Sequence, residues 1–269
     1  MATTYITRTP ASNGSDTKFT FSTWVKRGIT SAGQEFLFDY YSGGYDQFYF
    51  AFNANDTLAW QSYNGGSGPS NTSGETTRKF RDCGAWYHIV LAVDTTLASS
   101  GDRIRLYING VEETVFNSEN QPAQDTALAV NQTTETLYIG AEPPTPSGYF
   151  TGEMSHVQWV DGAQLTPTEF GSVDATSGIW KIKTSCYATP GTNGFCMKME
   201  DRTNLDLDSS SNAHTFVTSG TGLTATYDNP SNNFATFNPL LVPVSNKPSF
   251  ANGNTSVTTQ DAGGSYFGG

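Results

Sequence analysis

The run RIRLYINGV at residues 103–111 decides the fold class, because its apolar and polar side chains alternate until a turn signal. Side chains on a strand point to opposite faces in turn. One face is therefore predicted to enter a core and the other to face outward, the first formed by Ile104, Leu106 and Ile108 and the second by Arg103, Arg105 and Tyr107. Asn109-Gly110 favours a type I′ turn, whose two central residues need positive φ. The run predicts one arm of a β-hairpin that returns through 111–115.

Short apolar runs closed by turn residues recur on both sides of this hairpin and predict further strands. They lie at 19–26, 35–41, 47–52, 58–63, 86–94, 136–140, 150–160, 179–183 and 195–199. In the first run, Phe19, Phe21 and Val25 share one face and Trp24 falls on the other. The runs from 19 to 63 predict an antiparallel meander. The polar stretch 64–77 predicts a surface loop.

One segment predicts a helix, and it is a single turn long. In 166–171, Thr166 suits the cap, Pro167 the first helical position and Glu169 the capping box. No long helical period is present elsewhere. The chain of 269 residues is rich in aromatic residues (13%) and poor in charged ones (14%), which favours strands over helices. We therefore expect an all-β antiparallel domain over 1–200. An extended Asn/Ser/Thr-rich segment over 201–269 is predicted to dock on the domain or to link it to a neighbour.

The formal charge of −11 argues against two classes of partner. An acidic chain repels nucleic-acid phosphates and anionic membrane surfaces, so neither is expected as a ligand. No apolar stretch approaches the length of a membrane span, and Met1 to Pro10 lacks the apolar core of a secretory signal. We expect a soluble protein that starts in a cytoplasm.

The three cysteines are Cys83, Cys186 and Cys196. Cys186 and Cys196 flank the turn-like stretch 190–194, so they could face each other across a hairpin and form a disulfide. An odd cysteine count without a secretory signal favours the other interpretation, two reduced thiols on neighbouring strands. The spacing fits no usual zinc motif.

Five segments in order resemble the laminin-G-like, concanavalin A-like domains across residues 15 to 170. They are FTFSTWVK at 19–26, WYHIV at 86–90, LYING at 106–110, LYIG at 137–140 and FTGEM at 150–154. The resemblance implies a jelly-roll β-sandwich with a lectin-like architecture. It also implies that His88 is a framework residue rather than a catalytic one.

A second resemblance, to structural proteins of marine and cyanobacterial phages, rests on other segments. They are VDGAQLTPTEFG at 160–171, GTNGF at 191–195 and DNPSNNFATFNPL at 228–240. It implies a component of a virion, as a tail fibre, capsid fibre or decoration protein assembled in the host cytoplasm. It also implies contacts with other virion proteins and a homo-oligomer, for which we expect a trimer.

Aromatic residues supply the candidate carbohydrate site. Tyrosine and tryptophan rings are rigid and amphipathic, so a sugar can stack its C–H face on them. The rings that cluster around the Ser42-Gly43-Gly44 loop are Tyr40, Tyr41, Tyr45, Trp60 and Tyr63. They predict a surface that binds host glycans. The alternative is that these rings fill the core or a subunit interface.

The resemblance suggests Ca²⁺ as a bound ion, and no other cofactor is expected. Laminin-G-like domains can hold Ca²⁺ in loops at the rim of the sandwich, and Asp39, Asp94 and Asp102 are candidate ligands at strand ends. Each of them also suits an ordinary turn. A bound Ca²⁺ would need six to eight oxygen ligands.

The sequence predicts no enzyme. Glucanases of this fold carry acidic residues in the order Glu-x-Asp-x-x-Glu on one strand, which brings two carboxyls close together. No apolar-bounded strand here carries that spacing, since Glu112 and Glu113 are adjacent and point to opposite faces. No Gly-x-Ser-x-Gly segment is present. A glycan depolymerase is therefore disfavoured.

Overall fold

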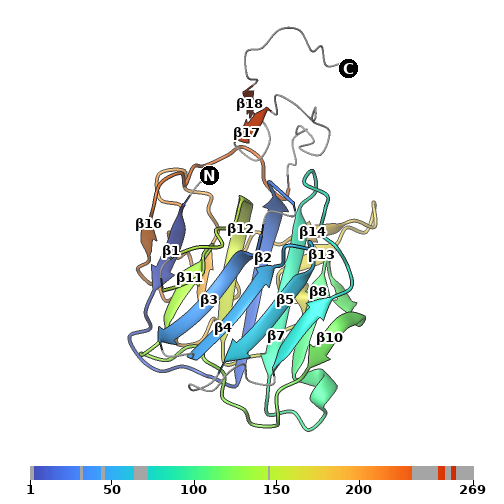
Figure 1. The fold of residues 1–269 in the computed structure, drawn as a ribbon, viewed down its shortest axis with the longest axis vertical. Coiled ribbons are helices and arrows are strands. Elements are labelled where there is room, and N and C mark those ends of the chain that lie inside the picture. Colours follow the sequence, from blue (N-terminus) through green and yellow to red (C-terminus); the bar gives the residue numbers. More distant parts are fainter. Residues whose placement is uncertain are drawn as a thin grey trace.

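Two antiparallel sheets face each other in the computed structural model, which describes residues 3–30, 33–43, 46–63, 72–144, 146–231, 248–251 and 256–258 (Figure 1). The larger sheet has the strand order β10-β6-β5-β4-β3-β11-β1-β16. Its strands are β1 Tyr5–Arg8, β3 Glu35–Gly43, β4 Asp46–Phe52, β5 Leu58–Tyr63, β6 Ser73–Thr76, β10 Phe116–Asn120, β11 Thr136–Ile139 and β16 Val217–Ser219.

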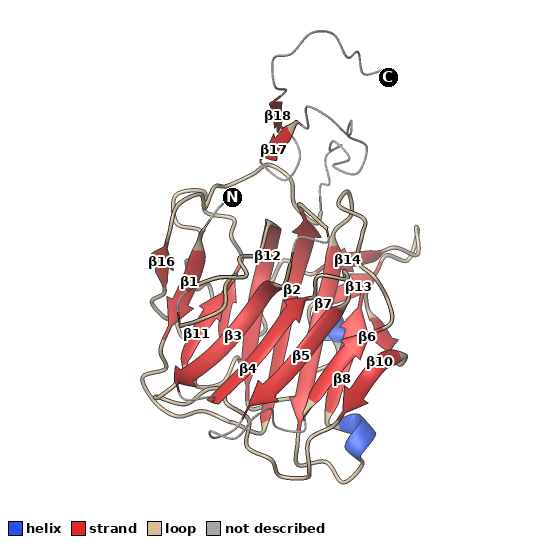
Figure 2. Cartoon of the chain, in the orientation of Figure 1, coloured by secondary structure: helices blue, strands red, loops and turns tan. Residues whose placement is uncertain are grey.

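The smaller sheet has the order β15-β12-β2-β7-β8-β9. Its strands are β2 Lys18–Arg27, β7 Tyr87–Asp94, β8 Ile104–Ile108, β9 Val111–Glu113, β12 Gly152–Asp161 and β15 Phe195–Met197. Two small hairpins pair with neither sheet, and they are formed by β13 Gly171–Val173 with β14 Trp180–Ile182 and by β17 Ser249–Ala251 with β18 Ser256–Thr258. The two layers overlie each other in Figure 2. The prediction of an all-β antiparallel sandwich is confirmed.

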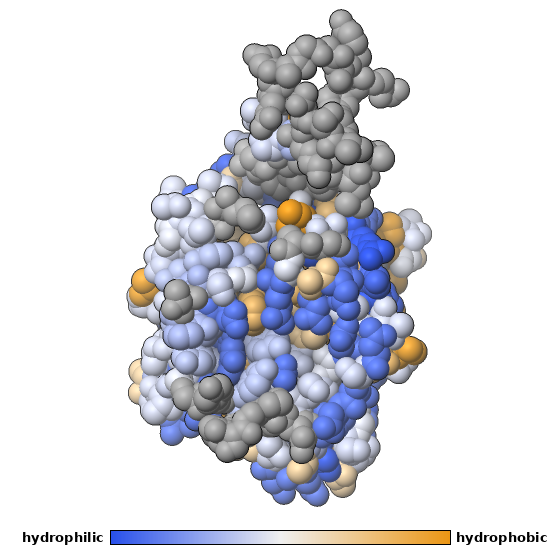
Figure 3. Space-filling model, viewed as in Figure 1, coloured by the Kyte–Doolittle hydropathy of each residue, from blue (hydrophilic) through white to orange (hydrophobic). Residues whose placement is uncertain are grey.

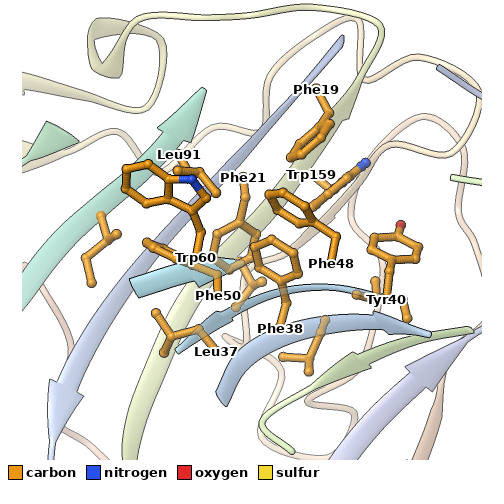
Figure 4. Packing of buried hydrophobic residues seen from close by; sticks show 14 of the residues in the cluster. Phe19, Phe21, Leu37, Phe38, Tyr40, Phe48, Phe50, Trp60, Leu91 and Trp159 are labelled. Carbon is orange, nitrogen blue, oxygen red and sulfur yellow. The ribbon is translucent and has the colours of Figure 1, made fainter. Parts of the chain in front are cut away.

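The core between the sheets is mainly aromatic. Trp159 stacks on Phe19 with ring centroids 4.6 Å apart, and it meets Phe38 edge-on at 5.3 Å (Figure 4). Its indole N–H donates to the buried Asn131 side chain at 2.9 Å, which satisfies the one polar atom of the ring. Pairs of offset or edge-on rings add stabilisation beyond the area they bury.

Several strand predictions hold in detail. Ile104, Leu106 and Ile108 lie in the core, as the alternation predicted. Phe19, Phe21 and Val25 also enter the core, whereas Trp24 points the other way and stacks on His88. The predicted turn is present, since Asn109 and Gly110 have φ values of 51° and 81°.

Two predictions about secondary structure were wrong, and a third was right in position but not in its capping. The strand containing residues 19–26 belongs to the smaller sheet, between β12 and β7, so the meander consists of β3, β4, β5 and β6 alone. Residues 73–76, predicted as loop, form β6; Gly74 lets this strand pass the ring of Trp60, which a Cβ atom would approach to 2.1 Å. The predicted single-turn helix is present as a 3-10 turn, Pro167–Glu169, with Thr166 at the N-cap position and Pro167 at the first helical position, but the Thr166 side chain caps no backbone N–H.

The interpretation of Cys186 and Cys196 as reduced thiols was also wrong. The two sulfurs form a disulfide, with Cα atoms 5.8 Å apart. Cys186 lies in the connection after β14, so the bond ties that connection to β15 rather than closing a hairpin. Cys83 is free and buried.

Part of the segment after residue 200 docks on the sandwich. β16 extends the larger sheet by pairing with β1, and Asp228 forms a buried ion pair with Lys26 and accepts a hydrogen bond from the indole N–H of Trp86 at 3.2 Å. A domain boundary at residue 200 stays a prediction. Within the described residues no helix is long and apolar enough to cross a membrane.

Candidate functional site

Two of the five predicted sugar-binding rings are core residues, and for them the prediction was wrong. Tyr40 is fully buried and packs on Trp159 at 5.1 Å. Trp60 is 1% exposed and packs edge-on against Phe116. Both side chains point between the sheets, so neither can present its face to a sugar. Tyr45 lies outside the described residues.

Tyr41 and Tyr63 lie on the opposite, outer face of the larger sheet, where both are partly exposed. The strand register places Tyr41 opposite Gln47 and Gln47 opposite Tyr63, so the three side chains form one row across β3, β4 and β5. Thr136 on β11 extends the row beyond Tyr41.

A second row beside it contains two tyrosines that the sequence analysis missed. Tyr138 on β11 pairs with Asp39 on β3, Asp39 with Tyr49 on β4, and Tyr49 with Gln61 on β5. Alternation could have found both tyrosines, because Tyr49 lies between the core residues Phe48 and Phe50, and Tyr138 lies between Leu137 and Ile139.

We call these two rows the tyrosine face; its residues are Asp39, Tyr41, Gln47, Tyr49, Gln61, Tyr63, Thr136 and Tyr138. In Figure 3 the surface over β3, β4 and β5 is coloured mainly blue to white. Neighbouring rings pack together on this side of the sheet: the centroids of Tyr49 and Tyr63 are 6.3 Å apart, and those of Tyr138 and Tyr5 are 5.8 Å apart. These contacts restrict the rings before any ligand arrives.

Hydrogen bonds orient the polar groups of the tyrosine face. The amide nitrogen of Gln47 donates to one carboxyl oxygen of Asp39 at 2.6 Å, and the hydroxyl of Tyr49 donates to the side-chain oxygen of Gln61 at 2.7 Å. The second carboxyl oxygen of Asp39 is buried without a hydrogen-bond partner. The face thus combines apolar rings with fixed acceptors, the combination found in sites that bind polar small molecules.

Burial perturbs the ionisable groups of the tyrosine face. It raises the pKa of Asp39 well above its usual range, and the nearby charge of Glu142 adds to this effect. Burial also raises the pKa of Tyr49 to about 12. Tyr49 therefore stays protonated at neutral pH and keeps its hydroxyl as a donor.

The three candidate calcium ligands do not meet in one site. Asp39 lies on the outer side of the larger sheet, whereas Asp94 ends β7 in the smaller sheet and pairs with Lys18 at 3.0 Å. Asp102 pairs with Arg105. Across the described residues, no group of three or more His, Cys, Asp or Glu side chains is placed to hold a metal ion.

A cavity of about 1060 Å³ is the second candidate site. It lies between β12 and the docked residues 222–231, and its wall includes Glu153 and His156. Burial raises the pKa of Glu153 and lowers that of His156. Nε2 of His156 lies 3.6 Å from the carboxyl group of Glu200, and Lys26 forms an ion pair with Asp228 of the docked residues. These pairs fasten the chain to itself, which makes the cavity the weaker candidate for a ligand site.

Comparisons with known proteins agree with the fold. A family model, Laminin_G_3, described as the concanavalin A-like lectin/glucanases superfamily, matches residues 1–169. No curated protein sequence matches the chain.

Solved structures resemble the chain at low identity. The SAP-like pentraxin of Limulus polyphemus is 16% identical with a TM-score of 0.42, and the match covers 61% of this chain and 72% of the pentraxin. A Bacteroides ovatus protein, described provisionally as carbohydrate-binding, is 13% identical with a TM-score of 0.47, over 84% of this chain and 60% of its own. The enzymatically active domain of bacteriophage CBA120 tailspike protein 2 is 14% identical with a TM-score of 0.42, and the match covers 61% of this chain and 25% of the tailspike chain. At these identities the likeness concerns the fold alone.

Proposed function

The chain belongs to the Laminin_G_3 family of the concanavalin A-like lectin/glucanases superfamily, and from this premise we propose that it binds a glycan on its tyrosine face. The observation that carries the proposal is the pair of side-chain rows on the outer side of the larger sheet. There, Tyr41, Tyr63 and Tyr138 alternate with hydrogen-bonding groups across neighbouring strands.

The spacing of these rows suits a sugar chain. Neighbouring strands lie about 4.8 Å apart, so the rings of Tyr41 and Tyr63, which are two strands apart, offer stacking surfaces roughly 10 Å from each other with Gln47 between them. Each ring presents an apolar face to the sugar C–H groups. Gln47 and Gln61 supply amide groups within the same rows, and such groups fix the orientation of a polar ligand.

Binding, rather than hydrolysis, is the activity we propose for this face. A retaining glycosidase needs two carboxyl groups about 5 Å apart, and an inverting one needs them about 6.5–9.5 Å apart. The eight residues of the tyrosine face include one carboxyl group, that of Asp39, which is fully buried.

We further propose that the chain serves this role as a structural part of a phage particle, as a tail fibre, capsid fibre or decoration protein. The support is the resemblance of segments 160–171, 191–195 and 228–240 to phage structural proteins. Its partners would then be other virion proteins and copies of itself, in a trimer. Detection of the chain in purified particles by mass spectrometry tests this context, and its absence from them would exclude it.

Glycan binding is tested with substitutions that remove one ring each. An array of bacterial surface polysaccharides and simple oligosaccharides, probed with and without Ca²⁺, identifies a binder. Tyr41→Ala and Tyr63→Ala should each weaken binding by about three- to ten-fold, the worth of one stacked ring.

Tyr227→Ala is the matched control, because Tyr227 is 76% exposed and lies on the docked segment away from the tyrosine face. Its loss should leave affinity unchanged. Absence of binding to every glycan, or binding by both tyrosine-face variants that is as strong as binding by the unmodified chain, contradicts the proposal.

A further inference from the structure

The larger sheet carries an unusual distribution of charge. Its eight strands contain a single basic residue, Arg8, and five acidic ones. The acidic residues are Glu35, Asp39, Asp46, Glu75 and Glu119. Glu35 pairs with Arg27 of the smaller sheet in the interior, so four acidic residues remain on the strands over which a ligand on the outer face would lie.

The single arginine does not offset these acids, because it points away from the tyrosine face. Arg8 is 8% exposed, and both of its terminal nitrogens donate to Asn193, to the backbone oxygen at 3.3 Å and to the side-chain oxygen at 3.2 Å. It pairs with Leu137, a core residue, whereas Thr7 beside it pairs with Tyr138 of the tyrosine face.

The loops around the tyrosine face add further negative charge. Glu142 raises the pKa of both Asp39 and Tyr49 through its charge, and Asp46 acts in the same way on Glu135. The charges that raise the pKa values of Asp39, Tyr49 and Glu135 come from neighbouring acidic groups and tyrosines. By sequence, the connections 44–45 and 64–71 contain no basic residue.

We propose that the tyrosine face selects glycans that carry no anionic group and prefers those that carry free amino groups. This inference rests on the proposed glycan-binding function and names its ligand class. A sialylated, uronic or phosphorylated sugar would bring a negative charge to a surface whose described residues offer no cation to receive it, and like charges at close range are repelled. A protonated amino sugar would be attracted by the same field.

Asp39 contributes most directly to this selection. Its carboxyl group lies between Tyr138 and Tyr49 in the register, and one of its oxygens has no hydrogen-bond partner. An ammonium group bound over the face would stabilise the ionised carboxylate, since an opposite charge nearby favours the charged form. Ligand amine and buried carboxylate therefore reinforce each other.

Matched pairs of immobilised oligosaccharides test the selection on the intact chain. One pair is a chitosan hexamer against the corresponding chitin hexamer, which differ in the acetylation of the amine. The other pair is sialyllactose against lactose. The chitosan hexamer should bind about two- to five-fold more tightly than the chitin hexamer, because its ammonium groups lie in the field of the acidic residues on these strands. Added salt should reduce that ratio toward one, because it screens exposed charges. Sialyllactose should bind more weakly than lactose.

Two substitutions separate charge from shape. Asp39→Asn should abolish the preference for chitosan over chitin, and Asp102→Asn, in the 3-10 turn before β8, is its control. Thr7→Lys places a cation beside Tyr138 and should raise the affinity for sialyllactose relative to lactose.

The outcomes distinguish the two proposals. If sialyllactose binds at least as tightly as lactose, and Tyr41→Ala weakens both, the charge inference is overturned while the proposed function stands. If chitosan binding exceeds chitin binding equally in wild type and Asp39→Asn, the role of Asp39 is overturned. If no glycan binds, both proposals fail together.

Discussion

The outer faces of the two sheets differ in what covers them. On the larger sheet, Tyr41 and Tyr63 are partly exposed, and the rows that contain them remain available to a ligand. On the smaller sheet, the chain itself covers the outer face: Val90, Tyr107 and Phe170 form a second buried cluster there. A sandwich built from two similar sheets therefore offers one face to a partner and seals the other.

Hydrogen bonds hold the cover on the smaller sheet. The indole N–H of Trp180, on β14, donates to Nδ1 of His88 at 3.0 Å, and the other ring nitrogen of His88 bonds Ser22 at 3.0 Å. The Gln164 side chain donates to the backbone oxygen of Asp102 at 2.8 Å. The disulfide between Cys186 and Cys196 then joins the end of the cover to β15. The difference shows that a strand pattern alone does not tell an open face from a sealed one.

The largest effect should come from separating the two sheets at Arg27. This residue ends β2 in the smaller sheet and pairs with Glu35 of the larger sheet at 2.7 Å and with Asp56 at 3.1 Å. All three side chains are buried. Arg27→Ala leaves two carboxyl groups buried without this cation, which should lower the free energy of unfolding by about 3–5 kcal/mol.

Chemical denaturation measures the change at Arg27. Arg105→Ala is the control, because Arg105 pairs with the exposed Asp102 and should shift the denaturation midpoint little. Equal shifts in the two variants would show that the buried network does not join the sheets.

An intermediate effect is the loss of stability at low pH that we expect from His88, which is buried under the cover of the smaller sheet. Burial between Trp24 and Trp180 lowers the pKa of His88 to about 3, whereas its value in the unfolded chain is about 6.5. The unfolded chain therefore binds a proton that the folded one rejects. The stability from neutral His88 is complete above pH 6.5 and is lost as the pH falls toward about 3, by about 1.4 kcal/mol per pH unit.

Denaturation midpoints measured across that pH range test the role of His88. His88→Gln should flatten the decline, since glutamine accepts the Trp180 hydrogen bond but does not titrate. Buried acids with raised pKa values, such as Glu35 and Glu153, act in the opposite direction, because acid stabilises their folded state. An unchanged slope in His88→Gln would assign the acid sensitivity to other groups.

Sequence alternation predicted the core side of most strands because each strand imposes a period of two. It predicted which side chains of β8 point into the core, and it predicted that Phe21 and Trp24 lie on opposite faces of β2. It did not resolve β3, whose run from Phe36 to Tyr41 is almost continuously aromatic and contains a register shift between Phe36 and Phe38. Without a clear alternation, Tyr40 and Tyr41 could not be assigned to opposite faces.

Long-range contacts explain the remaining failures. Tyr107 was predicted to face outward and does leave the main core, but a segment about 60 residues further along the chain covers it. The partner of Lys26 is Asp228, 202 residues away. No local sequence pattern predicts such a partner, because the contact depends on how distant segments pack once both sheets have formed.

The smallest expected change in stability is that of Tyr63→Ala, and comparing it with Tyr107→Ala tests the difference between the two outer faces most directly. Tyr63→Ala, on the open face, removes a ring that is already partly solvated, so the free energy of unfolding should change by about 0.5 kcal/mol or less. Tyr107→Ala, on the sealed face, empties part of a buried cluster and should cost about 3 kcal/mol. Because the two variants remove the same side chain from equivalent sides of the two sheets, the ratio of their effects measures the cover itself. Similar costs at both positions would mean that the face we assign to glycans is held as tightly by the protein as the one we regard as sealed.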